Sequence, residues 1–120
     1  MGREGFRGLK VWQKGKELAV FVYQITGSGS FTSDYGLRDQ IRRAAVSVPS
    51  NIAEGDGLGS DRQAVRYLNM ARGSTSEIIT QAAIAFEIGY INSNIFEELE
   101  SRCTEIMKML SKLISSKSNV

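Results

Sequence analysis

Apolar residues recur along this chain at spacings of three and four, the spacing of one face of an α-helix. The pattern is clearest near the C-terminus, where six residues follow one another at steps of 4, 4, 3, 4 and 3: Ile95, Leu99, Cys103, Ile106, Leu110 and Leu113. A second stripe consists of Leu37, Ile41, Ala44, Val48 and Ile52. No stretch alternates between apolar and polar residues as a half-buried strand does. The sequence therefore predicts an all-α protein.

Glycines and capping residues divide the pattern into four helices, expected at residues 9–26, 35–54, 61–88 and 95–115. Ser60 and Gln63 have the spacing of a capping box at the start of the third helix. Gly89 and the asparagines at 92 and 94 separate the last two helices. Because the connections are short, the economical fold is an antiparallel up-and-down four-helix bundle. We expect one domain over residues 1–120, with tails at 1–8 and 116–120.

Two positions leave the course of a helix open. Pro49 lies inside the second stripe, where it removes a backbone hydrogen bond and predicts a kink or a break. The stripe keeps its phase through Ile52, which favours a kink. The third helix either runs on through Gly73 or stops there and restarts with Ser74 and Glu77 as a second capping box. We favour the continuous helix.

The residues that the chain lacks exclude most catalytic chemistry. It has no histidine and one cysteine, Cys103, so it cannot build a Ser-His or Cys-His pair, an imidazole zinc site, a histidine-containing di-iron site or an internal disulfide. The segment GDGLG at 55–59 lacks the full G-x-G-x-x-G pattern and follows no strand, so it indicates a flexible connection. We expect no enzymatic activity, no metal and no cofactor.

The sequence also indicates where in the cell the protein is found. It contains no apolar run of about 18 residues and no basic-then-apolar leader. We therefore expect a cytoplasmic protein with no membrane partner.

Charge gives a further indication. The chain has 15 basic and 13 acidic residues, and pairs of basic residues four apart occur at Arg3/Arg7, Lys10/Lys14, Arg38/Arg42, Arg62/Arg66 and Lys108/Lys112. Basic ridges of this kind suit phosphate backbones. Arg38, Arg42, Arg43, Lys10 and Lys14 are the predicted nucleic-acid-binding residues. The alternative is a plain charged exterior, in which Asp34/Arg38 and Asp39/Arg43 are ion pairs that support the second helix.

Apolar residues on the first and third helices, including Trp12 and Phe86, spread beyond a single stripe. Small bundles often bury such excess apolar surface against another copy, so we expect a homo-oligomer. A single glycine at position 15 weakens the first helix by about 1 kcal/mol relative to alanine.

Three stretches carry a family resemblance: LKVWQKGKELAVFVYQIT at 9–26, YGLRDQIRRAAVSVPSNIAEGDG at 35–57 and YLNMARGSTSEIITQAAIAFEIGYI at 67–91. Together they resemble the four-helix bundle proteins encoded in intervening sequences of bacterial 23S ribosomal RNA genes, also labelled S23 ribosomal proteins. The chain is also similar to accessory proteins of diversity-generating retroelements, which form basic pentameric barrels that bind nucleic acid and a reverse transcriptase.

The resemblance implies a non-enzymatic protein that assembles as a homopentameric ring, with RNA or DNA as its partner. Its motif covers Ser47, Pro49, Asn51 and Glu54, which with Trp12 are the expected structural or interface residues. Asn51 and Glu54 would hold the kinked helix or a subunit interface. The second hypothesis, from a different class, is a scaffold that recruits a partner protein.

Overall fold

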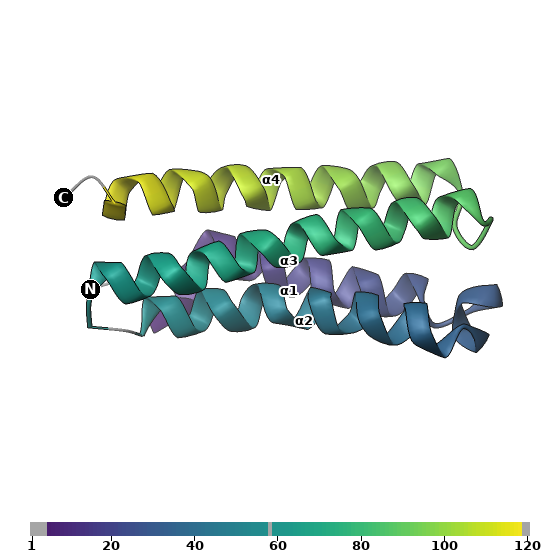
Figure 1. The fold of residues 1–120 in the computed structure, drawn as a ribbon, viewed down its shortest axis with the longest axis horizontal. Coiled ribbons are helices and arrows are strands. Elements are labelled where there is room, and N and C mark those ends of the chain that lie inside the picture. Colours follow the sequence, from purple (N-terminus) through teal and green to yellow (C-terminus); the bar gives the residue numbers. More distant parts are fainter. Residues whose placement is uncertain (1–4, 58, 119–120) are drawn as a thin grey trace.

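The computed structural model describes residues 5–57 and 59–118, and in this part of the chain all regular structure is helical (Figure 1). The four long helices are α1 (Lys10–Ile25), α2 (Tyr35–Asp56), α3 (Asp61–Glu87) and α4 (Ser93–Ser118). Two short 3₁₀ helices, η1 (Gly5–Gly8) and η2 (Gly29–Ser33), precede α1 and α2. The bundle measures 46 × 25 × 23 Å. The all-α prediction is confirmed.

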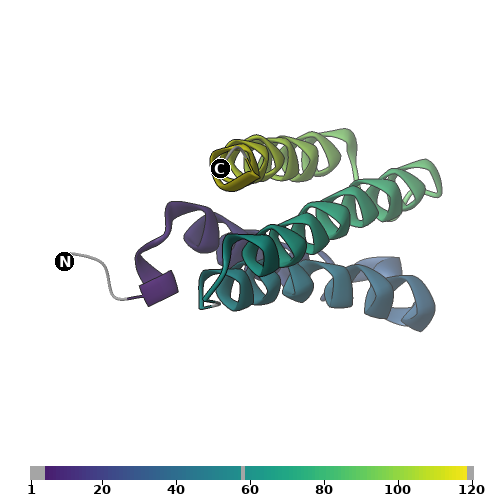
Figure 2. The same ribbon diagram turned by 60° about the vertical axis from the view of Figure 1, so that its left-hand side comes forward.

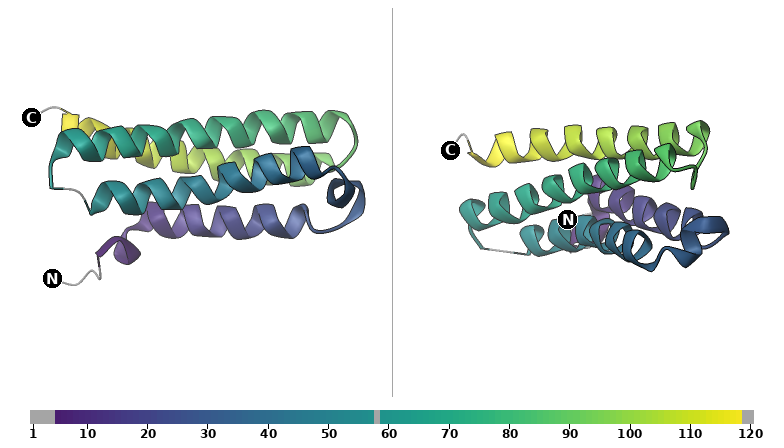
Figure 3. Two further views of the ribbon diagram at one scale, coloured as in Figure 1. Left: turned by 60° about the horizontal axis from the view of Figure 1, so that its bottom comes forward. Right: turned by 45° about the vertical axis from the view of Figure 1, so that its right-hand side comes forward.

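The helices are arranged up and down around one core. Each helix packs against the next one in the chain, and α1 also packs against α4, which closes the bundle (Figures 1 and 2). The starts of α1 and α3 and the ends of α2 and α4 therefore meet at one end of the molecule (Figure 3). We call this end of the bundle the shared end.

The predicted boundaries are right to within a few residues. The helix α2 extends two residues further than expected and includes Gly55, while α4 begins two residues earlier and ends three later. In the regions predicted as tails, residues 5–8 form η1 and residues 116–118 continue α4. The rest of both tails, 1–4 and 119–120, lies outside the described residues. Neither Gly73 nor Pro49 interrupts its helix, so the continuous third helix is confirmed and a break at Pro49 is excluded.

Side-chain caps explain where the helices begin. The Ser60 hydroxyl accepts a hydrogen bond from the Gln63 amide at 3.3 Å, so the predicted cap of α3 is confirmed. The Asn92 side-chain oxygen accepts from the Ile95 amide at 2.9 Å at the start of α4. Before it, Gly89 has φ +87°, a left-handed conformation that favours glycine and ends α3.

The core lies along the predicted stripes. It is formed by fully buried aliphatic side chains from all four helices, together with Phe31 from η2: Leu18, Val22, Ile41, Val48, Ile52, Leu68, Ile78, Leu99, Ile106 and Leu110. Gly15 is also buried, and a Cβ atom there would lie 3.3 Å from Val48 Cγ1 and 3.5 Å from Pro49 Cα. The glycine is therefore a point of close contact between α1 and α2, which corrects its interpretation as a weak point only.

Candidate nucleic-acid interface

Arg42 ties α2 to the end of α1. Its Nε donates a 2.8 Å hydrogen bond to the Thr26 hydroxyl, and its guanidinium lies 4.5 Å from the centre of the Tyr23 ring. Thr26 is buried and donates its own proton to the Val22 carbonyl at 2.7 Å. The guanidinium thus satisfies a buried hydroxyl while its charge stacks on an aromatic face. This arrangement gives Arg42 a structural role whatever it binds.

Arg38 is also largely engaged within the chain. Its Nη1 donates to the Thr32 carbonyl at 3.0 Å, its Nε lies 3.1 Å from a carboxylate oxygen of Asp39, and its guanidinium covers the Tyr35 ring at 4.8 Å. Arg43 is exposed and has no ion pair among the described residues.

The ion pairs expected along α2, Asp34/Arg38 and Asp39/Arg43, do not form. Asp34 instead caps α2 by accepting from the Leu37 amide at 3.1 Å, and its other oxygen accepts from the Tyr90 hydroxyl at 2.9 Å. Asp39 is occupied by Arg38. Helical spacing of four residues permitted both predicted pairs, but the Leu37 amide and the Tyr90 hydroxyl occupy the Asp34 carboxylate, and the neighbouring Arg38 occupies that of Asp39.

Lys10 and Lys14 lie apart from these arginines. The Lys14 ammonium pairs with Glu105 of α4 at 3.5 Å, and Lys10 lines a groove between α1 and α4 together with Lys112. Arg42, by contrast, contacts the far end of α1 from the α2 side. The five predicted nucleic-acid-binding residues therefore fall into two separate groups, and the structure does not bring them together as one surface.

The fold instead separates charge along the bundle axis. The half that holds the shared end consists of residues 5–17, 46–57, 59–73 and 106–118, and it carries ten basic and four acidic side chains, a net charge of +6. The other half, residues 18–45 and 74–105, carries four basic and eight acidic side chains, a net charge of −4. We call the first the basic half and the second the acidic half. The basic half contains Lys10 and Lys14, whereas Arg38, Arg42 and Arg43 lie in the acidic half.

Seven basic side chains of the basic half are exposed and have no ion pair among the described residues: Arg7, Lys10, Lys16, Arg62, Arg66, Lys108 and Lys112. They stand on η1, α1, α3 and α4, whereas the part of α2 in this half carries acidic side chains only. The sequence showed that Arg62/Arg66 and Lys108/Lys112 are basic pairs four residues apart, but it did not show that both pairs lie in the same half of the bundle. The antiparallel topology brings them to the same half.

The motif residues of α2 face α3 and form a polar layer. Asn51 Nδ2 donates to both the carbonyl and the hydroxyl of Ser47, each at 2.9 Å. The hydroxyls of Ser47 and Ser74 lie 2.9 Å apart, and Ser74 donates to the Met70 carbonyl at 3.2 Å. Because the single proton of the Ser74 hydroxyl goes to the Met70 carbonyl, the Ser47 hydroxyl donates to Ser74, and the chain of bonds runs from α2 to α3. These residues join two helices of one chain.

The remaining expected structural residues have different surroundings. Trp12 is half-buried, with the Phe6 ring edge-on at 5.2 Å and the Lys16 ammonium 5.4 Å from its ring centre. Pro49 lines a surface groove between α1 and α2. Glu54 is exposed and makes no ion pair in the described part of the chain.

Cys103 is a core residue. It is fully buried, and burial raises the pKa of its thiol to about 12, with the nearby Glu100 carboxylate adding to the effect. Residues 5–57 and 59–118 contain no group of three histidine, cysteine, aspartate or glutamate side chains placed to hold a metal ion. None of their helices is long and apolar enough to cross a membrane.

Comparison with known proteins places this bundle in a family. The profile of the 23S rRNA-intervening sequence proteins matches residues 7–112, which is most of the chain. The chain belongs to this family. A crystal structure from the S23 ribosomal protein family of Bacteroides thetaiotaomicron VPI-5482, described as a protein with unknown function, is similar with a TM-score of 0.80. It shares 25% sequence identity with this 23S rRNA-intervening sequence protein, over 87% of this chain and 97% of the other. Curated proteins give no match.

Proposed function

We propose that this chain is a non-enzymatic homo-oligomeric bundle that binds RNA or DNA through its basic half. The observation that carries the proposal is the separation of charge, with a net +6 gathered in one half of a chain whose total is +2. A concentrated field of one sign attracts a phosphate backbone more strongly than the same charges dispersed over the surface. The family to which the chain belongs is named for intervening sequences of 23S rRNA, which agrees with an RNA partner.

The binding would be electrostatic and independent of base sequence. Lys10, Arg62, Arg66, Lys108 and Lys112 are free to neutralise phosphates, because none of them is held by a carboxylate in the described residues. Each neutralised phosphate releases counterions, so affinity falls as salt rises. With about four phosphate contacts, raising salt from 50 to 200 mM would weaken binding roughly 100-fold.

The test is fluorescence anisotropy with a labelled RNA hairpin and a labelled single-stranded DNA at several salt concentrations. Lys108→Glu together with Lys112→Glu reverses two charges of the basic half at exposed positions. We expect this variant to bind both probes at least 10-fold more weakly and with a shallower salt dependence, since two phosphate contacts are removed.

Arg38→Glu together with Arg43→Glu is the matched control, because it reverses two charges in the acidic half. Arg42 is left unchanged, since its bond to Thr26 supports the packing of α1 on α2. Equal losses in both variants would point to net charge alone, and a loss confined to the control would return the binding surface to α2. Either result would overturn the assignment to the basic half, and a wild-type chain that binds neither probe would overturn nucleic-acid binding itself.

A scaffold that recruits a partner protein is the second candidate. It is favoured by the apolar side chains that stay exposed on the bundle, among them Val20, Val46, Ile84 and Ile88. Under this hypothesis the Lys108/Lys112 charge reversal leaves partner capture intact, whereas substitutions at these apolar positions abolish it.

A further inference from the structure

Between α1 and α4 the bundle has an open groove of about 500 Å³ near the shared end, and we call it the α1–α4 groove. Figure 2 brings this end forward and shows the last turns of α4 above the start of α1. The apolar lining consists of Leu9 and Val11 at the start of α1 and of Met109 and Leu113 on α4. The volume lies within the range of about 300–1,000 Å³ that is usual for small-molecule sites.

The groove carries a positive charge on each wall. Lys10 lines it from α1 and Lys112 from α4. Both lysines are exposed and have no ion pair among the described residues. None of the described residues that line the groove is acidic. A negatively charged group would therefore meet two ammonium groups here, with apolar surface beside it.

A second cavity of about 130 Å³ lies next to the groove, on its inner side. Its lining includes Ile52 of α2 and Leu68 of α3, which are fully buried. Leu9 and Leu113 line both cavities and are only partly buried, so their side chains lie between the groove and the interior. A change of rotamer at either leucine would join the two cavities. Asp56 also lines the inner cavity, which disfavours a negative group there and leaves that place to an apolar one.

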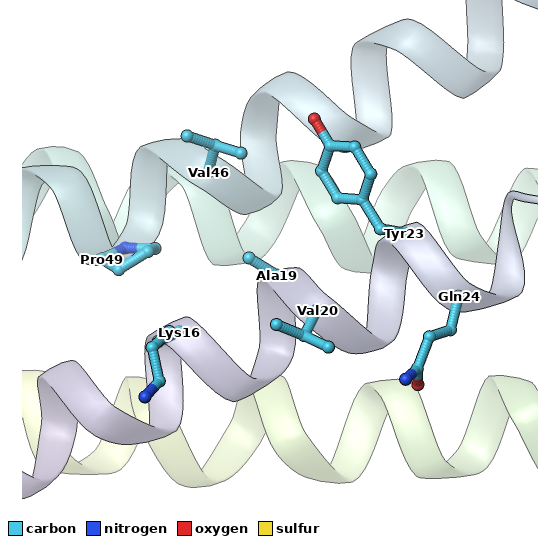
Figure 4. A pocket seen from close by; sticks show the side chains of 7 residues that line it. All are labelled: Lys16, Ala19, Val20, Tyr23, Gln24, Val46 and Pro49. Carbon is cyan, nitrogen blue, oxygen red and sulfur yellow. The ribbon is translucent and has the colours of Figure 1, made fainter.

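The groove between α1 and α2 has a similar volume, about 470 Å³, but a different distribution of charge (Figure 4). Lys16 is the one cation among the described residues that line it. The Lys16 ammonium lies 5.4 Å from the centre of the Trp12 ring. An anion in this second groove would meet a single ammonium that already contacts an aromatic face, so the α1–α4 groove suits an anion better.

We propose that the α1–α4 groove binds a free amphiphilic anion, a single hydrocarbon chain that ends in a carboxylate. The carboxylate lies between Lys10 and Lys112, and the chain passes Leu9 and Leu113 into the inner cavity. That cavity favours one flexible chain over a partner helix, because a helix with its side chains is about 10 Å wide. The site goes beyond the proposed function, since it requires neither nucleic acid nor a second copy of the chain.

Isothermal titration calorimetry with decanoate, below the concentration at which it forms micelles, tests the site directly. We expect saturable binding of one decanoate per chain, with a negative heat-capacity change because apolar surface is buried. Decanol has the same chain without the charge and should bind more weakly. Acetate has the charge without the chain and should give no detectable binding. A wild-type chain that does not bind decanoate would overturn the proposal.

Removing the two cations tests the position of the carboxylate. In Lys10→Gln together with Lys112→Gln, we expect the affinity for decanoate to fall at least about 10-fold, because two charge-assisted hydrogen bonds are lost. The affinity for decanol should stay unchanged. Arg62→Gln together with Arg66→Gln is the matched control, since it removes two exposed charges of the same half outside the groove. Equal losses in the two double variants would show an effect of net charge and overturn the assignment.

Larger side chains at the inner boundary test the position of the hydrocarbon chain. Leu113→Trp and Leu9→Trp each fill the passage, so we expect decanoate and decanol to bind at least about 10-fold more weakly, with helical circular dichroism retained. Val20→Trp enlarges an exposed residue of the groove between α1 and α2 and should bind decanoate as the wild type does.

Two results with these tryptophan variants would overturn the proposal. One is unchanged decanoate binding in both leucine variants, and the other is a loss confined to Val20→Trp, which would move the site to the groove between α1 and α2. If a leucine variant does not fold, the lysine variants still decide. The titrations contain no nucleic acid, so their result is separate from that of the anisotropy experiments.

Discussion

Individual residues in this protein often have roles that their type alone does not reveal. Gly15 reduces helix propensity, yet its missing Cβ lets α1 lie against Val48 and Pro49 of α2. Asn51 is a polar residue within a helix, where it bonds the Ser47 carbonyl and starts the chain of hydroxyls that reaches α3. In both cases the contact that explains the residue comes from a neighbouring helix or from the preceding turn.

A larger side chain at Gly15 should destabilise the bundle. Gly15→Leu places four carbons where even a Cβ is 3.3 Å from Val48, so α1 and α2 must move apart. We expect the free energy of unfolding to fall by about 1–3 kcal/mol, as for overpacked cores. Urea denaturation measures the change, and Glu17→Leu, the same side chain at an exposed position of α1, serves as the control. Equal effects of the two substitutions would show that the close contact is not limiting.

The thiol of Cys103 should be unreactive and should make stability depend on alkaline pH. Burial raises its pKa from about 9 to about 12, so the neutral form is favoured more in the folded than in the unfolded state. That stabilisation is complete below pH 9 and is lost as the pH rises toward 12. We expect constant urea midpoints from pH 7 to 8.5 and a decline above pH 9, and the decline should be smaller in Cys103→Ala.

A thiol reagent gives a second measurement on Cys103. An aromatic disulfide at pH 8 should react with the native chain at least about 100-fold more slowly than with the urea-unfolded chain, because the buried thiol supplies little thiolate. Comparable rates in the two states would mean that Cys103 is accessible, contrary to its place in the core.

At the scale of elements, side chains near the short connections form contacts with two helices or turns at once and so hold them together. Asp34 caps α2 with one carboxylate oxygen and holds the Tyr90 hydroxyl, which follows α3, with the other. The Tyr90 ring also lies 5.4 Å from Phe31 of η2, which is fully buried. This cluster joins η2, α2 and the segment after α3 at the end of the bundle opposite the shared end.

Removing the Asp34 carboxylate should weaken that end. Asp34→Ala loses the cap and the bond to Tyr90, so we expect the free energy of unfolding to fall by about 1–2 kcal/mol. Tyr90→Phe removes only the second bond and should cost less. Asp39→Ala, which breaks an exposed ion pair on the same helix, is the control and should change stability by less than about 0.5 kcal/mol. An Asp34→Ala effect no larger than this control would contradict the assigned role.

At the scale of the whole molecule, the antiparallel topology converts a nearly balanced composition into two halves of opposite charge. The same topology sends Lys10 and Lys14 to one half and Arg38, Arg42 and Arg43 to the other, although all five lie between residues 10 and 43 of the sequence. The charge reversals on α4 and α2 proposed above test the consequence of this arrangement for the whole molecule.

Much of the fold was determined by the sequence itself. The repeat of apolar residues at three and four is a local property, and it predicted four helices, the core stripes on α2 and α4, and the cap at Ser60. The family could also be recognised from the sequence, because the motif around residues 40–55 is one contiguous segment. These features depend on neighbours within one helical turn or one segment, so the sequence alone contains them.

The placement of charge and of exposed apolar surface was decided only by the tertiary structure. Trp12 lies half-buried against the bundle, whereas Val20, Val46, Ile84 and Ile88 remain exposed. Which carboxylate meets which arginine, and which helix face lacks a cover, depends on the rotation of each helix about its axis and on its antiparallel register. The rotation and the register are set by packing between segments far apart in the chain, so they cannot be predicted from residue spacing within one segment.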